Sequence, residues 1–123
     1  MLKKLATTIT SLIATLALVV GVSGCAASDK IDMSKVTSVI DVRTPAEYDA
    51  GHLQGAVNVD VEGTDFVGTI SALDTNGVYV LYCHSGRRAG IALDAMKSMG
   101  FKNVTNAGGI DAASAATGLA IVQ

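Results

Sequence analysis

One stretch of the sequence combines a nucleophile with fixed positive charge, because Cys83 is followed by a short loop that contains two arginines. The run Val78–Tyr82 before it is β-branched and aromatic, which predicts a strand buried on both faces. Apolar residues recur at helical spacing from about Arg88 to Met99, which predicts a helix. Cys83 therefore stands where a strand passes into a helix. The N–H groups and positive dipole end of a helix start favour the reactive thiolate.

Two other interpretations of Cys83 are weaker. A buried and inert cysteine fits poorly with a flank rich in glycine and arginine. A phosphatase or arsenate reductase also surrounds a cysteine with an oxyanion-binding loop, but the tyrosine-phosphatase type needs five residues between cysteine and arginine. Here four residues separate Cys83 from Arg88, and Ala89 occupies the required position. The shorter loop suits a single sulfur atom better than a tetrahedral phosphate.

The start of the chain is typical of an exported lipoprotein. Lys3 and Lys4 precede an apolar stretch from residue 5 to 22, as in a secretory signal. The segment Val22–Cys25 resembles a lipobox, in which the cysteine is lipidated and becomes the new N-terminus. The alternative is an uncleaved anchor, since a membrane span needs about 20 apolar residues. We expect a signal peptide at 1–24, a tether at 25–35 and one domain at 36–123, lipid-anchored to the outer face of a bacterial cell membrane or to a periplasmic side.

The expected mature chain is mildly acidic. Removing 24 of the 123 residues leaves 99, and the loss of Lys3 and Lys4 takes the formal charge from −2 to −4. No basic patch is present, so no nucleic-acid partner is predicted. If Cys25 is lipidated, Cys83 has no disulfide partner, and a lone thiol outside the cytoplasm needs a reason such as catalysis.

The periodicity of the mature part predicts an α/β fold with a mainly parallel sheet of about five short strands and helices on both faces. In such sheets ligands bind beyond the carboxyl ends of the strands. Cys83, the segment Asp41–Arg43 and the loop at Gly108–Gly109 should therefore meet over one pocket. Strands are expected at 36–42, 56–59, 78–82, 101–104 and 119–122, and helices at 44–50, 65–73, 88–99 and 110–116.

Four segments resemble motifs of the rhodanese family of sulfurtransferases, and together they span about 36–122. They are 40–48, 51–59, the six-residue loop 83–88 and the Gly-Gly segment 106–110. The resemblance implies a small rhodanese fold in which Cys83 takes a sulfane sulfur from thiosulfate or a related anionic donor and passes it to cyanide or a thiol. This chemistry runs through a persulfide on Cys83 and requires no metal or other cofactor.

The loop after Cys83 supplies the expected binding groups. A ring of backbone N–H groups can hold an anionic persulfide, and an arginine at the mouth can attract an anionic donor. Family position favours Arg88 as the arginine that faces the loop interior. The candidate substrate-binding residues are His84, Ser85, Gly86, Arg87, Arg88 and Arg43.

Two residues near the first predicted helix have structural interpretations. An ion pair between Arg43 and Asp41, linked to Glu47 or His52, would fasten loops together, and contact of Arg43 with the pocket is the alternative. His52 has no nearby nucleophile in the sequence and is interpreted as a satisfied hydrogen-bonding residue.

The chain departs from the family pattern in two places. Many relatives carry arginine where His84 stands, and the region after the Gly-Gly segment lacks the tryptophan often found there. Both differences bear on substrate range more than on mechanism. A second functional hypothesis is a persulfide carrier or sulfide-binding module that serves a partner protein without turnover. The oligomeric state is not readable from the sequence.

Overall fold

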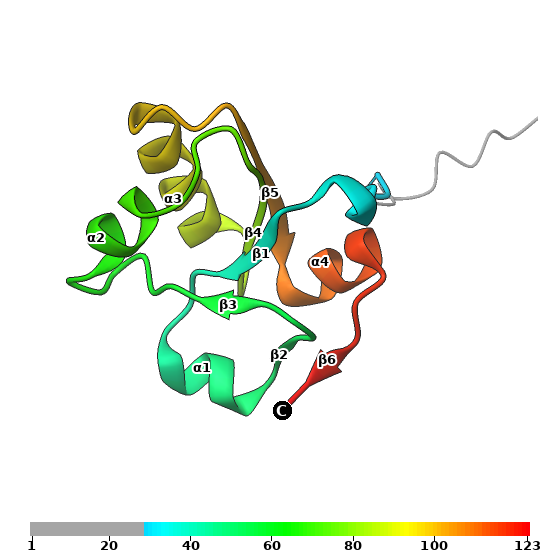
Figure 1. Ribbon diagram of the computed structural model, residues 1–123. Helices are drawn as coiled ribbons and strands as arrows, with labels where there is room; N and C mark the ends of the chain where they lie inside the picture. The colour runs from blue at the N-terminus through cyan, green and yellow to red at the C-terminus, as the bar shows by residue number, and fades with distance from the viewer. Residues whose placement is uncertain (1–28) are drawn as a thin grey trace, which may run out of the picture.

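A computed structural model describes residues 29–123, so the predicted signal peptide and Cys25 lie outside the described residues. The helices and strands alternate along this part of the chain, as the periodicity predicts (Figure 1). Their order is η1 (Met33–Lys35), β1 (Ser38–Asp41), α1 (Pro45–Ala50), β2 (His52–Leu53), β3 (Val57–Asn58), α2 (Phe66–Ser71), β4 (Val78–Cys83), α3 (Arg87–Ser98), β5 (Asn103–Gly109), α4 (Ile110–Thr117) and β6 (Ile121–Val122).

The α/β fold is confirmed, with a correction to the strand count. The main sheet has four parallel strands in the order β3-β1-β4-β5, not about five. The terminal strand β6 instead pairs with β2 in a separate antiparallel ribbon, in which His52 lies opposite Val122. β6 thus closes the end of the chain against β2 rather than extending the main sheet.

Helices cover both faces of the sheet, as predicted. The side chains of β4 alternate: Tyr79, Leu81 and Cys83 face the cluster formed with α2 and α3, and Val80 and Tyr82 face the cluster beside α4. In Figure 1, α2 and α3 lie on one side of the strands and α4 lies on the other. Both faces of β4 are therefore buried, which explains its continuous apolar sequence.

The strand β5 is longer than the sequence indicates. Gly108 and Gly109, expected to form a loop, are the last residues of β5. The register shifts by one residue between the pairs Leu81–Asn106 and Cys83–Gly109, so a β-bulge places one extra residue on β5. Such a bulge re-aims the end of a strand, and here it brings the two glycines beside the Cys83 loop.

The segment before β1 packs on the domain, which corrects part of the expected tether. Ile31 donates its N–H to the carbonyl of Ala116 at 2.9 Å, and Ile31 and Met33 pack against the core cluster beside α4. The chain thus enters the described domain beside the end of α4, at the amino edge of the sheet and away from Cys83 (Figure 1). Between residues 29 and 123, no helix has the length and apolar character needed to span a membrane.

Candidate active site

Cys83 is the last residue of β4, and its side chain is buried, with an exposed fraction of 0%. Its Sγ atom accepts a hydrogen bond from the backbone N–H of Gly86 at 2.9 Å. The residue also belongs to the apolar cluster that β1, β4 and α3 form. The sulfur is therefore held between aliphatic side chains and the loop that follows it, a closed position that the sequence did not predict.

The turn after Cys83 depends on Gly86. This residue has a φ of +93°, a conformation that side chains rarely adopt, and it directly precedes α3. Within residues 29–123, the backbone N–H groups of His84, Ser85, Arg87 and Arg88 donate no hydrogen bond to a protein acceptor. Unpaired donors at the start of a twelve-residue helix form the kind of environment that stabilises an anion.

The end of β5 supports this loop from the side. The Asn106 side chain donates to the carbonyl of Gly86 at 2.9 Å and accepts the N–H of Gly108 at 2.8 Å. A side chain at Gly109 would collide with the carbonyl of His84, so only glycine permits this close approach. Sequence reasoning identified the Gly-Gly segment as a family motif but missed the role of Asn106, whose position on the loop depends on the bulge.

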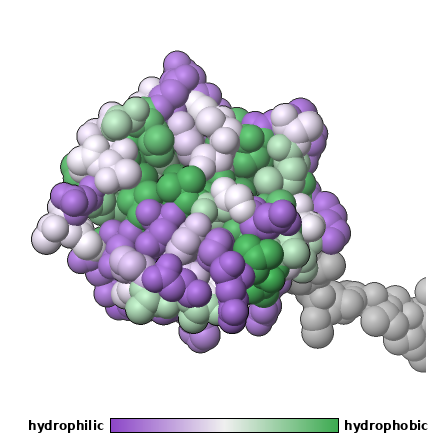
Figure 2. Space-filling view, turned by 60° about the horizontal axis from the view of Figure 1, so that its bottom comes forward, coloured by the Kyte–Doolittle hydropathy of each residue, from purple (hydrophilic) through white to green (hydrophobic). Residues whose placement is uncertain are grey.

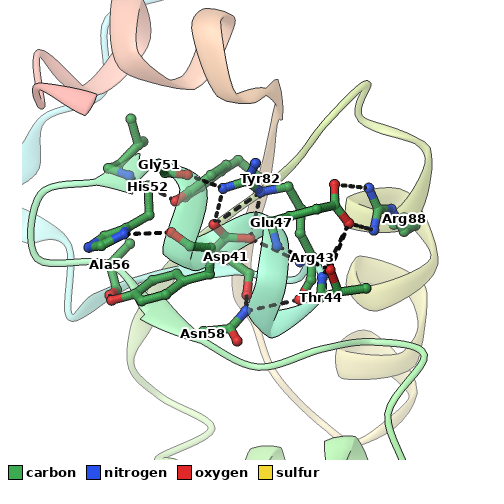
Figure 3. Close-up of polar contacts among 12 residues, drawn as sticks. Asp41, Arg43, Thr44, Glu47, Gly51, His52, Ala56, Asn58, Tyr82 and Arg88 are labelled. Atoms are coloured by element: carbon green, nitrogen blue, oxygen red, sulfur yellow. Dashed lines mark hydrogen bonds and ion pairs between the residues drawn. The ribbon is translucent and has the colours of Figure 1, made fainter. Parts of the chain in front are cut away.

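Arg88 forms a bidentate ion pair with Glu47, at 2.7 Å for Nη1–Oε1 and 2.9 Å for Nη2–Oε2 (Figure 3). Glu47 also closes the capping box of α1, because its carboxylate accepts from Thr44 and its N–H donates to the Thr44 hydroxyl. The hydrogen bonds from Arg88 lower the pKa of Glu47 to about 2, and the same pair raises the pKa of Arg88. Arg88 thus ties the start of α3 to α1.

Arg43 has a different environment, although it lies only four residues from Glu47. Its guanidinium donates to both carboxylate oxygens of Asp41 and to the carbonyl of Gly51 (Figure 3). The hydrogen bond with Asp41 raises the pKa of Arg43 against the opposing effect of burial. These contacts favour the structural interpretation, with Gly51 in place of the expected link to Glu47 or His52. A role for Arg43 in substrate binding stays a prediction.

The remaining predicted residues are found as follows. His84, Ser85 and Arg87 have exposed side chains at the loop surface. His52 Nδ1 lies 2.8 Å from the carbonyl of Tyr48, and the two rings stack, which confirms that His52 is a satisfied structural residue. Residues 29–123 contain no cluster of three potential metal ligands.

A pocket of about 350 Å³ opens at the carboxyl edge of the sheet, but Cys83 does not line it. Its walls come from the start of α1, the end of β3, the loop 60–65 and the start of α2. This pocket and the buried sulfur are therefore separate, and a pocket over Cys83 formed together with 41–43 and 108–109 stays a prediction.

The comparisons place the chain in a family. The family described as the rhodanese-like domain matches residues 26–116, and the chain belongs to it. The thiosulfate sulfurtransferase PspE of Escherichia coli is 37% identical over 71 residues, which cover 58% of this chain and 68% of that protein. The Bacillus subtilis protein YrkF, described as a candidate sulfur carrier protein, is 34% identical over 77 residues, which cover 63% of this chain and 40% of YrkF.

Solved structures agree with this assignment. A structure described as a rhodanese with anions from E. coli has a TM-score of 0.59 and 31% identity, covering 70% of this chain and 96% of that one. The rhodanese-like domain of the Alr3790 protein from Anabaena has a TM-score of 0.62 and 27% identity, covering 72% and 82%. The chain is thus a member of the rhodanese-like sulfurtransferase family with the fold of that family.

Proposed function

We propose that this protein transfers sulfane sulfur through a persulfide on Cys83, with thiosulfate or a related compound as donor. The observation that carries the proposal is the position of Cys83 at the end of β4, with its Sγ bonded to the Gly86 N–H and with four neighbouring loop amides that have no protein acceptor among residues 29–123. The family and the named activity of its relative PspE support the same chemistry.

The reaction consists of two nucleophilic displacements on sulfur. In the first, the Cys83 thiolate attacks the outer sulfur of thiosulfate, an S–S bond forms to Cys83, and sulfite leaves with the electron pair of the broken bond. In the second, a thiolate or cyanide attacks the terminal sulfur and releases the Cys83 thiolate. The two steps balance without an external oxidant. The negative terminal sulfur of the persulfide is stabilised by the amides of residues 84–88.

Access to the sulfur requires movement of the loop. Cys83 is fully covered, whereas His84 and Ser85 are exposed and their N–H groups have no protein acceptor within residues 29–123. Displacement of 84–86 breaks the Asn106 contact with the Gly86 carbonyl and the Gly86 N–H contact with Sγ, but as a local opening it costs less than opening the core. We propose that this displacement admits the donor and that the loop amides, four of which have no protein acceptor within residues 29–123, then bind the new terminal sulfur.

Mass spectrometry of the purified protein after thiosulfate treatment tests the proposal. The expected result is a gain of one sulfur atom on Cys83 that is lost when cyanide is added. Cys83→Ser should take up no sulfur and should retain the far-UV circular dichroism of the parent. Sulfur uptake by the folded serine variant would overturn the assignment of the nucleophile.

A carrier without turnover is the second candidate, and the similarity to YrkF favours it. Steady-state assays with free thiosulfate and cyanide separate the two functions. Repeated turnover supports the enzyme, and a single stoichiometric loading supports the carrier.

For localisation we propose a lipid anchor at Cys25. The described chain begins beside the end of α4, and Cys25 lies a few residues before it in the sequence. Cys25→Ser should move the protein from the membrane fraction to the soluble fraction. Retention of this variant in the membrane would contradict the lipidation and favour an uncleaved apolar anchor.

A further inference from the structure

The pocket at the carboxyl edge is bordered by carboxylates rather than by cations. Pro45, Val59 and Phe66 contribute its apolar lining, and Asp60 and Asp65 contribute its acidic rim. Glu62 belongs to the same loop and is exposed. Within residues 29–123, none of the three carboxylates of the loop 60–65 forms an ion pair. Figure 2 turns the side that carries α1 forward and shows hydrophobic residues bordered by hydrophilic ones.

Part of this acidity is accounted for by local structure, and part is not. Asp60 accepts the N–H of Glu62 at 2.9 Å, which stabilises a turn. Asp65 precedes α2 but makes no side-chain capping bond, and Glu62 makes no hydrogen bond through its side chain within the described residues. Two of the three charges thus have no role in holding the loop together.

The acidic loop and the reactive loop are both anchored in the same core cluster. Val59 belongs to the same buried cluster as Cys83, and Val61 packs against that cluster. The pKa of Arg88 is raised mainly by its hydrogen bond with Glu47. The charges of Cys83 and Glu62 raise it further, so Glu62 lies close enough to act on Arg88. A molecule bound over loop 60–65 would therefore approach the segment that covers the sulfur.

The amino edge of the sheet carries the lysines, whereas the carboxyl edge near Cys83 carries mostly acidic charge. The lysines of the described residues lie toward the amino edge. Lys30 lies beside the end of α4 and Lys35 lies before β1. Lys97 lies in the last turn of α3 and Lys102 lies just before β5. At the reactive edge, Arg43 and Arg88 are neutralised by Asp41 and Glu47, which leaves Arg87 as the fixed cation without an ion pair in residues 29–123. The reactive edge is thus net negative around the pocket.

We infer that loop 60–65 and its pocket form a docking surface for a basic protein that exchanges sulfur with Cys83 through its own cysteine. The inference rests on the proposed function and specifies its partner. A surface with three carboxylates that form no ion pair in the described part of the chain attracts a cationic partner and speeds its association, whereas it repels a small dianion such as thiosulfate. The apolar lining of the pocket gives a partner side chain a place to bury.

Model acceptors of equal length test this inference on the full-length protein in zwitterionic micelles. Each peptide carries a single cysteine flanked by lysines, by serines or by glutamates, and the rate of sulfur transfer from the loaded protein is measured. At about 20 mM ionic strength we expect the lysine peptide to react about tenfold faster than the glutamate peptide, with the serine peptide between them. At about 500 mM salt, where the screening length is short, the difference in rate between the peptides should largely disappear.

Matched variants locate the effect on the surface. The triple variant Asp60→Asn, Glu62→Gln, Asp65→Asn should lose the preference and should load from thiosulfate at least as fast as the parent, because a repulsive charge has been removed. The control Asp29→Asn, Asp74→Asn, Asp94→Asn makes the same change at exposed residues away from this surface and should keep the preference. An equal preference in all three proteins, or none in the parent, would overturn the inference.

A binding measurement separates this inference from the proposed function. Fluorescence anisotropy of the lysine peptide with serine in place of its cysteine reports docking without any sulfur chemistry. If Cys83 fails to load but this peptide binds the parent and the control more tightly than the loop 60–65 variant, the proposed function fails and the docking surface stands. If Cys83 loads but the three proteins bind the peptide equally, the docking surface is refuted and the sulfur chemistry stands.

Discussion

Two ion pairs near α1 have similar chemistry and different surroundings. Arg43 and Asp41 are 7% and 0% exposed; Asp41 is the last residue of β1, and Arg43 follows two residues later. Arg88 and Glu47 are 17% and 33% exposed, lie 41 positions apart in the sequence, and join α3 to α1. The first pair fixes a local corner of the chain, and the second connects the reactive loop to the rest of the fold.

This difference indicates how the site combines rigidity with access. Three hydrogen bonds from the Arg43 side chain satisfy the buried Asp41, and the Tyr82 ring lies 5.7 Å below the guanidinium. Removing one partner would leave a buried charge without compensation. The Glu47–Arg88 pair reaches solvent, so water can replace either partner at lower cost. The buried pair is therefore expected to control stability, and the exposed pair to control the loop.

The largest effect is expected from Asp41→Ala. The variant leaves the Arg43 guanidinium buried without its carboxylate, which should lower the free energy of unfolding by about 3–5 kcal/mol in urea denaturation. The double variant Asp41→Leu, Arg43→Met serves as the control, because it leaves no unpaired charge and should be less destabilised. A loss below about 1 kcal/mol in Asp41→Ala would show that the buried pair does not stabilise the corner.

Glu47→Gln should have a smaller effect on stability and a clear effect on sulfur transfer. Glutamine can still accept from Thr44 but cannot form the ion pair with Arg88, so the start of α3 loses its connection to α1. We expect a cost of about 1 kcal/mol in stability and a fall of about tenfold in the rate of sulfur transfer. Asp49→Asn, an exposed change in the same helix, should affect neither. Wild-type transfer rates in Glu47→Gln would mean that Arg88 needs no such connection.

The same pair predicts a pH dependence of stability. The pKa of Glu47 is lowered in the folded state to about 2 from an ordinary value of 4.5, mainly by the hydrogen bonds from Arg88. The stabilisation is therefore complete above pH 4.5 and is lost as the pH falls toward 2. The difference in unfolding free energy between the parent and Glu47→Gln should shrink over this range, and a constant difference would contradict the prediction.

The smallest effect is expected from an ion pair at the amino edge. Lys35 Nζ lies 3.9 Å from Asp32, and their side chains are 79% and 59% exposed. Since solvent screens such a pair, Lys35→Ala should change the unfolding free energy by less than about 0.5 kcal/mol. A loss of stability comparable to that of Glu47→Gln would mean that solvent exposure does not determine how much each of the three ion pairs stabilises the fold.

The sequence by itself determined the features that depend on near neighbours. The alternation of strands and helices, the Thr44–Glu47 capping box and the Asp41–Arg43 pair all join residues within a few positions, so spacing and residue type are enough to predict them. The strand-to-helix position of Cys83 follows from the same periodicity. The four motifs in order were sufficient to indicate the family.

Only the tertiary structure decided which distant residues meet. The partner of Glu47 is Arg88, not the neighbouring Arg43, because the parallel order β1-β4 brings the starts of α1 and α3 together. The bulge in β5 places Asn106 on the Gly86 carbonyl, and packing between β4 and α3 buries Cys83. These contacts depend on strand order, register and side-chain packing, which involve parts of the chain too far apart for periodicity to relate.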